Sequence, residues 1–354
     1  MIRKTLAVLF VLILTSGLAQ AFEGITEKSR DAVILLAGEN EDGTNQGMGS
    51  AFFVTPEGLA ITNYHVIHGV EKIRGWFYDV EDMNYYWVEV QAIDPVADLA
   101  LVKVKLPDHK LPVKYLEIES NVNNIKVGED VMAIGHMLGL DWTVTKGIIN
   151  HTHRDGLVSP YVHIIQHTAH INRGNSGGPL LNSEGKVVGV NTYVLSPKGS
   201  WTGVAYATRG DDVYFSFVQM RDDAKVTRPA MRLKIGTINE WRRNAILQKY
   251  PDAKIPNTFG LIVGEVLEED SWGIKQGVRQ FDTLVGIDGF PVNNMDQLDA
   301  LIAHKKPGDI LTLTIIRDYH FILLEYELAE MEFNDFEKFY DERQQRMKEE
   351  FSNE

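Results

Sequence analysis

The amino-acid sequence predicts a mainly β protein with a larger all-β domain followed by a small α+β domain. The chain has 354 residues, a length that corresponds to roughly two domains. From residue 22 to about 221, short β-branched and apolar segments alternate with Gly, Pro, Asn and Asp, which is typical of a β-barrel or β-sandwich. After a charged segment that ends at Pro229, predicted strands alternate with predicted helices, which indicates a separate α+β domain.

The elements of both regions follow from local composition and periodicity. Strands of the first region are predicted at Ala32–Leu36, Gly49–Val54, Val88–Ile93, Leu99–Val104, Val131–Ile134, Val144–Ile149, Val162–Gln166 and Val187–Thr192. Strands of the second region are predicted at Leu261–Val266, Leu284–Ile287, Leu311–Ile316 and Phe321–Leu328. Helices are predicted at Ser271–Gln276 and Met295–His304, the second because its apolar residues recur at helical spacing.

Composition excludes several classes of function. With no cysteine, the chain has no disulfide, zinc–thiolate site or cysteine nucleophile. A formal net charge of −14 argues against a general nucleic-acid binder or a binder of anionic membranes.

The N-terminus has the pattern of a secretory signal. Arg3 and Lys4 precede an apolar run at residues 6–14, and the small-residue pattern Ala19-Gln20-Ala21 follows. The run is shorter than the roughly 20 apolar residues of a spanning helix. We therefore expect cleavage after Ala21, a periplasmic protein and no stable membrane insertion, with an uncleaved anchor as the alternative.

One serine lies in a run of small residues, from Ile171 through Asn172-Arg173-Gly174-Asn175-Ser176-Gly177-Gly178-Pro179 to Leu180. Glycine lets backbone N–H groups approach a ligand closely, so one loop can hold both a nucleophilic hydroxyl and an oxyanion hole. An ordinary turn between strands is the alternative for this run alone.

Two upstream positions favour the catalytic interpretation. His65 follows a predicted strand in Thr62-Asn63-Tyr64-His65, and Asp98 begins a strongly apolar strand, where an unpaired acid is costly to bury. Asp94 competes with Asp98 but lies further from that strand. The order His65, Asp98, Ser176 is that of chymotrypsin. An α/β-hydrolase requires the order Ser, Asp, His and a helix after the serine, which Pro179 and the following apolar segments do not support.

These stretches resemble the HtrA/Deg family of serine proteases. The matching residues are Gly49–Val54, Thr62–Val66, Asp98–Val104, Ala133–Gly135, Thr143–Ile148, Ile171–Leu181, Asn191-Thr192 and Gly203–Ala207. The resemblance implies a trypsin-like double β-barrel, a triad of His65, Asp98 and Ser176, and oxyanion donors at the N–H groups of Gly174 and Ser176. It also implies a homotrimer or a higher homo-oligomer. The sequence departs from the family pattern at Arg173, where proline is usual, and at Thr168 and His170.

Paired histidines suggest an alternative function in metal binding. His151 and His153, like His163 and His167, have the spacing of one strand face, so a zinc site is conceivable. Exposed strand faces are the simpler expectation, because neither cysteine nor an obvious carboxylate cluster accompanies them. We therefore expect no metal and no cofactor.

The second region resembles a single PDZ domain of the HtrA type. The matching stretches are Gly273–Val278, Asp282–Gly289 and Lys306–Asp309, and the resemblance places a carboxylate-binding loop at Lys234-Ile235-Gly236-Thr237. C-terminal peptides are the expected ligands there. The predicted boundaries are a signal peptide at 1–21, a trypsin-like protease domain at 22–222, a linker at 223–229, a PDZ domain at 230–329 and a charged helical tail at 330–354.

Three classes of function follow from these patterns. The first is a periplasmic serine endopeptidase that cleaves unfolded or damaged polypeptides in protein quality control and the stress response, regulated through its PDZ domain. The second is a regulatory protease with one narrow substrate in stress signalling. The third is a chaperone or peptide-binding scaffold whose triad is dispensable.

Overall fold

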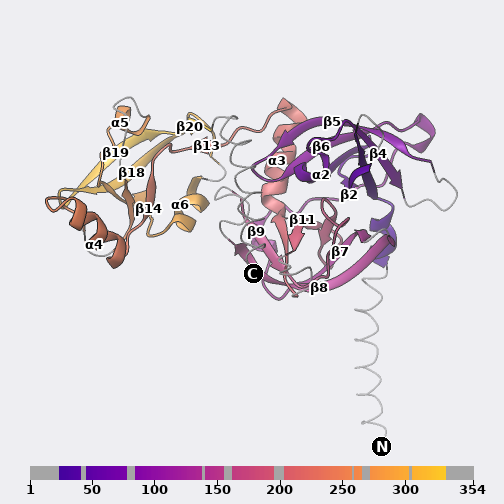
Figure 1. Ribbon diagram of the computed structural model, residues 1–354, viewed down its shortest axis with the longest axis horizontal. Helices are drawn as coiled ribbons and strands as arrows, with labels where there is room; N and C mark the ends of the chain where they lie inside the picture. The colour runs from indigo at the N-terminus through magenta and orange to yellow at the C-terminus, as the bar shows by residue number, and fades with distance from the viewer. Residues whose placement is uncertain are drawn as a thin grey trace, which may run out of the picture. The chain divides into compact units, whose positions relative to one another are not determined.

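The protein divides into two compact units in a computed structural model, and the division falls between Val226 and Thr227 (Figure 1). The structure describes residues 24–40, 45–77, 84–137, 140–154, 162–194, 203–256, 259–264, 272–302 and 305–331. The predicted signal sequence and residues 332–354 of the predicted tail lie outside these ranges. None of the helices that the structure describes is long and apolar enough to cross a membrane.

The first unit contains two closed antiparallel barrels. In the first barrel the strand order is β1-β2-β3-β6-β5-β4, and β4 pairs with β1 to close it. Its strands are β1 (Val33–Glu39), β2 (Asn45–Phe53), β3 (Leu59–Thr62), β4 (Lys72–Phe77), β5 (Tyr86–Asp94) and β6 (Leu99–Val104). Alternate residues of these strands face inward, as the pleat of a strand dictates, and form a core that includes Ile34, Phe53, Ala100 and Val102.

The second barrel repeats this arrangement in the order β10-β11-β12-β9-β8-β7. Its strands are β7 (Asp130–Met137), β8 (Leu140–Arg154), β9 (Ile164–His167), β10 (Pro179–Leu181), β11 (Val187–Val194) and β12 (Ala205–Arg209). Its core includes Val131, Ile149, Ile165, Leu180 and Ala207. Because all the pairings are antiparallel and both sheets close, neither barrel leaves an exposed sheet edge.

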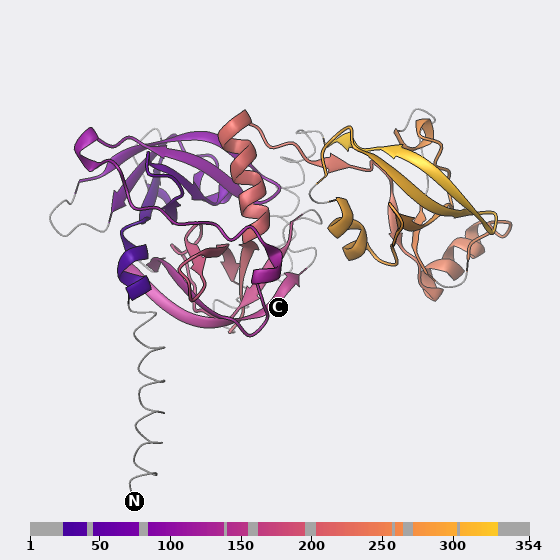
Figure 2. The same cartoon turned by 180° about the vertical axis from the view of Figure 1, so that it is seen from behind.

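Helices contribute little to the first unit, but one of them joins its two barrels. A single-turn helix, α2 (Tyr64–Ile67), follows β3, and α3 (Gly210–Asp223) follows β12. Two 3-10 turns lie at Asp108–Lys110 and Val122–Asn124. Helix α3 packs against β5 and β6 of the first barrel as well as β11 and β12 of the second (Figures 1 and 2). It ends where Ala224 takes a left-handed backbone, a usual way to stop a helix.

The second unit is built on one antiparallel sheet of order β14-β15-β16-β18-β19, with β17 paired to β16. Its elements are β13 (Pro229–Ala230), β14 (Ile235–Thr237), α4 (Glu240–Lys249), β15 (Leu261–Val263), α5 (Trp272–Lys275), β16 (Thr283–Ile287), β17 (Phe290–Pro291), α6 (Met295–Ile302), β18 (Ile310–Arg317), β19 (His320–Glu327) and β20 (Ala329–Glu330). Strands β13 and β20 pair separately. Helix α4 packs Ile246 and Leu247 onto a small core around Ile255 and Ile262.

Candidate active site

The structure brings His65 and Asp98 together in the first barrel. Helix α2 presents His65, whose ring Nδ1 lies 2.8 Å from Asp98 Oδ2. The backbone N–H of His65 donates to Asp98 Oδ1 at 2.9 Å, so both carboxylate oxygens point at the same residue. The histidine side chain is 30% exposed and the aspartate side chain only 2% exposed. The geometry leaves Nε2 as the ring nitrogen that faces away from the carboxylate.

The backbone conformation of Asp98 directs its carboxylate toward the imidazole of His65. Asp98 has φ +54°, in the left-handed region that few residues other than glycine adopt without cost. Its C=O accepts hydrogen bonds from the N–H of Tyr64 (3.1 Å) and from Asn63 Nδ2 (2.8 Å). The stretch before His65 and the turn before β6 therefore hold each other in place.

Ser176 lies in a tight loop of the second barrel, just before β10. Gly174 has φ +100°, and a Cβ at this position would overlap the C=O of His136. Only glycine fits both the backbone conformation and the space. Ser50 in the first barrel ties the loop down: its Oγ–H donates to the C=O of Gly174 at 2.7 Å, and its N–H donates to the C=O of Ser176 at 2.8 Å. Sequence analysis gave Ser50 no role.

The loop leaves two N–H groups for a ligand. The N–H groups of Asn175, Gly177 and Gly178 donate to the C=O groups of Asn172, Asn191 and Asn175. Those of Gly174 and Ser176 donate to no acceptor within the described part of the chain. These are the two predicted oxyanion donors. Arg173 replaces the usual proline here, and its N–H donates to Asn172 Oδ1 at 2.8 Å, a bond that proline cannot make.

The hydroxyl of Ser176 bonds a backbone carbonyl and not the histidine in this structure. Ser176 Oγ–H donates to the C=O of Thr192 at 3.2 Å, and the ring of His65 bonds only Asp98 among the described residues. Catalytic hydrogen bonds are often loose or unmade without substrate and form when substrate binds.

The expectation that the histidine pairs lie on exposed strand faces is wrong for His163 and His167, which are buried. The Nδ1 of His163 lies 2.8 Å from Asp212 Oδ2, and its ring centroid is 4.6 Å from that of His153. His163, Asp211 and Asp212 could together surround a cation. However, Arg209 donates Nε and Nη2 to the two oxygens of Asp211, so a guanidinium already pairs with one of the two carboxylates.

His167 faces the interior of the second barrel, on the same side of β9 as Ile165. Its side chain is fully buried, and both ring nitrogens lack a hydrogen bond within the described residues. Burial lowers the pKa of His167 from 6.5 to about 3, because the charged imidazolium would lose its hydration. The imidazole is therefore neutral at physiological pH.

Residues 235–237, at which a carboxylate-binding loop was predicted together with Lys234, form an edge strand. They become β14 because they pair with Leu261–Val263, and β14 is the outermost strand of its sheet. The C=O of Lys234 accepts from the N–H of Gly264, and the N–H of Ile238 donates to the C=O of Gly260, one residue beyond each end of β15. In an antiparallel pair, Ile235 and Thr237 therefore direct their backbone groups outward. Arg242, from α4, donates to the outward C=O of Thr237 at 2.8 Å.

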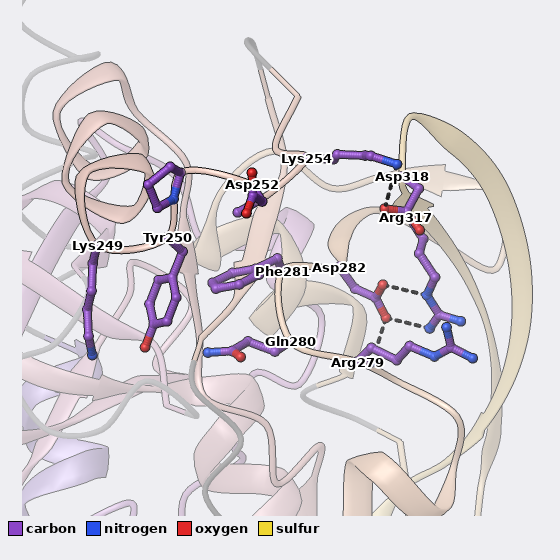
Figure 3. A pocket seen from close by; sticks show the side chains of 12 residues that line it. Lys249, Tyr250, Asp252, Lys254, Arg279, Gln280, Phe281, Asp282, Arg317 and Asp318 are labelled. Carbon is purple, nitrogen blue, oxygen red and sulfur yellow. Dashed lines mark hydrogen bonds and ion pairs between the residues drawn. The ribbon is translucent and has the colours of Figure 1, made fainter.

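A hollow of about 490 Å³ lies elsewhere in the second unit, between the end of α4 and residues 279–282 and 317–318 (Figure 3). Asp282 accepts two hydrogen bonds from Arg317, and Lys254 Nζ lies 3.6 Å from Asp318 Oδ1. The hollow contains none of the predicted site residues.

Comparison with known proteins places this geometry in a family. Residues 49–190 match the model of the trypsin-like peptidase domain. Over 278 residues the chain is 34% identical to a probable periplasmic serine endoprotease DegP-like of Rickettsia conorii, covering 77% of the chain and 51% of that protein. The chain belongs to the HtrA/DegP-like serine endoprotease family. A DegP-like protein of Marinomonas is 30% identical over 78% of the chain and 56% of its own length.

Solved structures of HtrA-type proteases share the fold. The HtrA-type protease AlgW with tripeptide superposes with a TM-score of 0.75 at 23% identity, over 88% of this chain and 97% of that one. A serine endoprotease from Yersinia pestis gives a TM-score of 0.65 at 23% identity, over 88% and 98%. The prediction of a trypsin-like double barrel followed by an α+β unit is confirmed. The chain spans about half the length of the curated DegP-like relatives it matches.

Proposed function

We propose that this HtrA/DegP-like chain is a periplasmic serine endopeptidase that cleaves unfolded polypeptides, with His65, Asp98 and Ser176 as its triad. The observation that carries the proposal is the pair of hydrogen bonds between Asp98 and His65, together with a loop in which the N–H groups of Gly174 and Ser176 have no acceptor among the described residues. The names of the DegP-like relatives support an endoprotease of the periplasm.

The mechanism follows from the residue types and their geometry. Asp98 fixes the orientation of His65 by bonding Nδ1, and it stabilises the imidazolium that forms during the reaction. Ser176 turns its hydroxyl from Thr192 to Nε2 of His65, which takes the proton as the oxygen attacks the peptide carbonyl. The same nitrogen then protonates the leaving amine. The N–H groups of Gly174 and Ser176 bind the oxyanion.

Loss of the nucleophile tests the triad. Ser176→Ala removes only an oxygen atom, so we expect the protein to stay folded while turnover of unfolded casein falls by about 10⁶-fold. Circular dichroism checks folding, and gel electrophoresis follows cleavage. Unchanged casein cleavage by the folded variant would show that Ser176 is not the nucleophile.

We also propose that C-terminal peptides bind beside β14 and raise the activity at Ser176, with the second unit acting as a PDZ domain. Edge strands recognise extended peptides by adding them to the sheet, and the outward N–H and C=O of Ile235 and the outward N–H of Thr237 supply the hydrogen bonds, while Arg242 occupies the C=O of Thr237. Activation requires that the peptide favour the active state, and a typical coupling gives roughly 5- to 150-fold activation.

A proline at the sheet edge tests this regulation. Thr237→Pro removes an outward N–H without breaking a bond to β15, and proline is tolerated on edge strands. We expect weaker binding of a fluorescent C-terminal peptide and loss of peptide-stimulated cleavage, while basal cleavage is retained. Thr237→Val keeps the N–H and the side-chain shape, so it serves as the control. Peptide stimulation that survives Thr237→Pro would exclude this edge.

We also propose that the signal is cleaved after Ala21, that the chain assembles as a homotrimer or a higher homo-oligomer, and that the domain boundaries lie near residues 222 and 230. Residue 330, at which a helical tail was predicted to begin, lies in β20.

A further inference from the structure

The turn that presents Asp98 is held by side chains of the second half of the chain. This turn, Asp94–Asp98, connects β5 to β6 of the first barrel and ends in the positive φ of Asp98. Within it, the N–H of Ala97 donates to Asp94 Oδ1 at 3.3 Å, and the N–H of Asp98 bonds the C=O of Pro95 at 3.4 Å. Both bonds are long, so internal hydrogen bonds alone hold an uncommon backbone conformation weakly.

Helix α3 holds one end of this turn by a hydrogen bond. Ser216 Oγ–H donates to Asp94 Oδ2 at 2.6 Å, and both residues are buried. The hydrogen bond is charge-assisted and short, which places it among the strong ones. Asp94 therefore has one carboxylate oxygen on the turn and the other on α3, whose sequence position is more than a hundred residues away.

Strand β12 holds the other end of the turn by a hydrogen bond between the two barrels. Thr208 Oγ1–H donates at 3.2 Å to the C=O of Ala97, the residue directly before Asp98. The same hydroxyl lies 3.3 Å from Thr192 Oγ1, and the C=O of Thr192 accepts the hydroxyl of Ser176. Thr208 and Thr192 are both buried, so the contact is shielded from water.

We propose that Thr208 and Ser216 are positioning residues that hold the Asp94–Asp98 turn so that Asp98 points at His65. The inference rests on the proposed triad. Neither hydroxyl touches substrate or the reacting atoms; each acts through the backbone or carboxylate of the turn. Because both come from elements that follow Ser176 in the chain, they also tie the general base in the first barrel to the nucleophile in the second.

Removal of one hydroxyl with little change in shape tests the role of Thr208. In the full chain, Thr208→Val keeps the volume and is expected to lower kcat about 10- to 100-fold with KM within about twofold, as a misplaced catalytic group does. Thr208→Ser retains the hydroxyl and is expected to restore most of the lost kcat. Ser216→Ala is also expected to lower kcat. Rates of all variants are measured with a peptide reporter substrate.

A double-mutant comparison separates positioning from general destabilisation. If Thr208 acts through Asp98, then Thr208→Val changes kcat by less than about twofold in an Asp98→Asn background, because the group it positions is already disabled. Full additivity of the two changes would overturn the proposal.

The control is Thr283→Val in the second unit, a buried threonine whose hydroxyl has no hydrogen bond to any described residue. It is expected to cleave like the original protein. Folded Thr208→Val and Ser216→Ala proteins with normal kcat would also overturn the proposal. Normal activity of Asp98→Asn or Ser176→Ala alone would instead refute the triad, so the two failures are distinguishable.

Discussion

His167 is a titratable residue inside an otherwise apolar barrel, and it predicts how stability depends on pH. Its pKa is about 3 in the folded protein and 6.5 when exposed in the unfolded chain. Below pH 6.5 the unfolded state binds a proton that the folded state does not, so the stabilisation that depends on a neutral His167 declines as pH falls from 6.5 toward 3. The slope from this residue alone is about 1.4 kcal/mol per pH unit.

Replacement of His167 by an apolar residue of similar size tests whether this side chain causes the pH dependence of stability. Between pH 7 and pH 5, we expect the free energy of unfolding of His167→Met to fall by about 2 kcal/mol less than that of the original protein. Urea unfolding at each pH measures this difference. His170→Gln is the control, because no comparable burial applies to this half-exposed side chain. Identical pH slopes for the His167 variant and the original protein would show that another group is responsible.

Gly174 predicts a second effect at the residue scale. An alanine there must adopt φ +100° and displace the C=O of His136, so the donor at position 174 moves. We expect Gly174→Ala to cut kcat by about 10² to 10³, the usual cost of one oxyanion donor. Gly128→Ala is the matched control: its φ is +85° but nothing lies near the added carbon. Equal activity of the two variants would argue against Gly174 as a donor.

At the element scale, the sequence predicted strands whose residues are apolar on both faces or evenly alternating, such as β6, which is almost wholly buried. It did not predict β4, because Lys72, Arg74 and Gly75 interrupt its apolar residues and only part of the strand faces the core. Helix α3 was missed too. Its apolar stripe is short, and polar residues are buried beside it, so its amphipathic pattern is weak. The buried residues are Gly210, Asp211, Asp212, Val213, Ser216, Phe217 and Met220.

The same limit explains which parts of the site could be predicted. His65, Asp98 and Ser176 occupy short local motifs with distinctive neighbours, so pattern and order were enough to select them. Ser50, Thr208 and Ser216 are single hydroxyls that matter only through partners distant in the chain. Buried hydroxyls of this kind leave no periodic or spacing signal in one sequence, and only the three-dimensional structure identifies them.

At the scale of the whole molecule, two barrels each contribute part of the proposed catalytic centre. The first holds His65 and Asp98, and the second holds Ser176 and the two proposed oxyanion donors. Hydrogen bonds from Ser50, Asn63 and Thr208 join these parts across the barrels. The activity of the protein should therefore depend on the packing of the two barrels as much as on any one residue.

The most direct test of this catalytic centre is the site of covalent labelling by a fluorophosphonate, which reacts only with an activated serine hydroxyl. Peptide mapping by mass spectrometry should find a single adduct, on Ser176, and labelling should be lost in His65→Ala, which retains the serine but not its base. An adduct on another serine, or equal labelling of Ser176 without His65, would contradict the triad proposed for this chain.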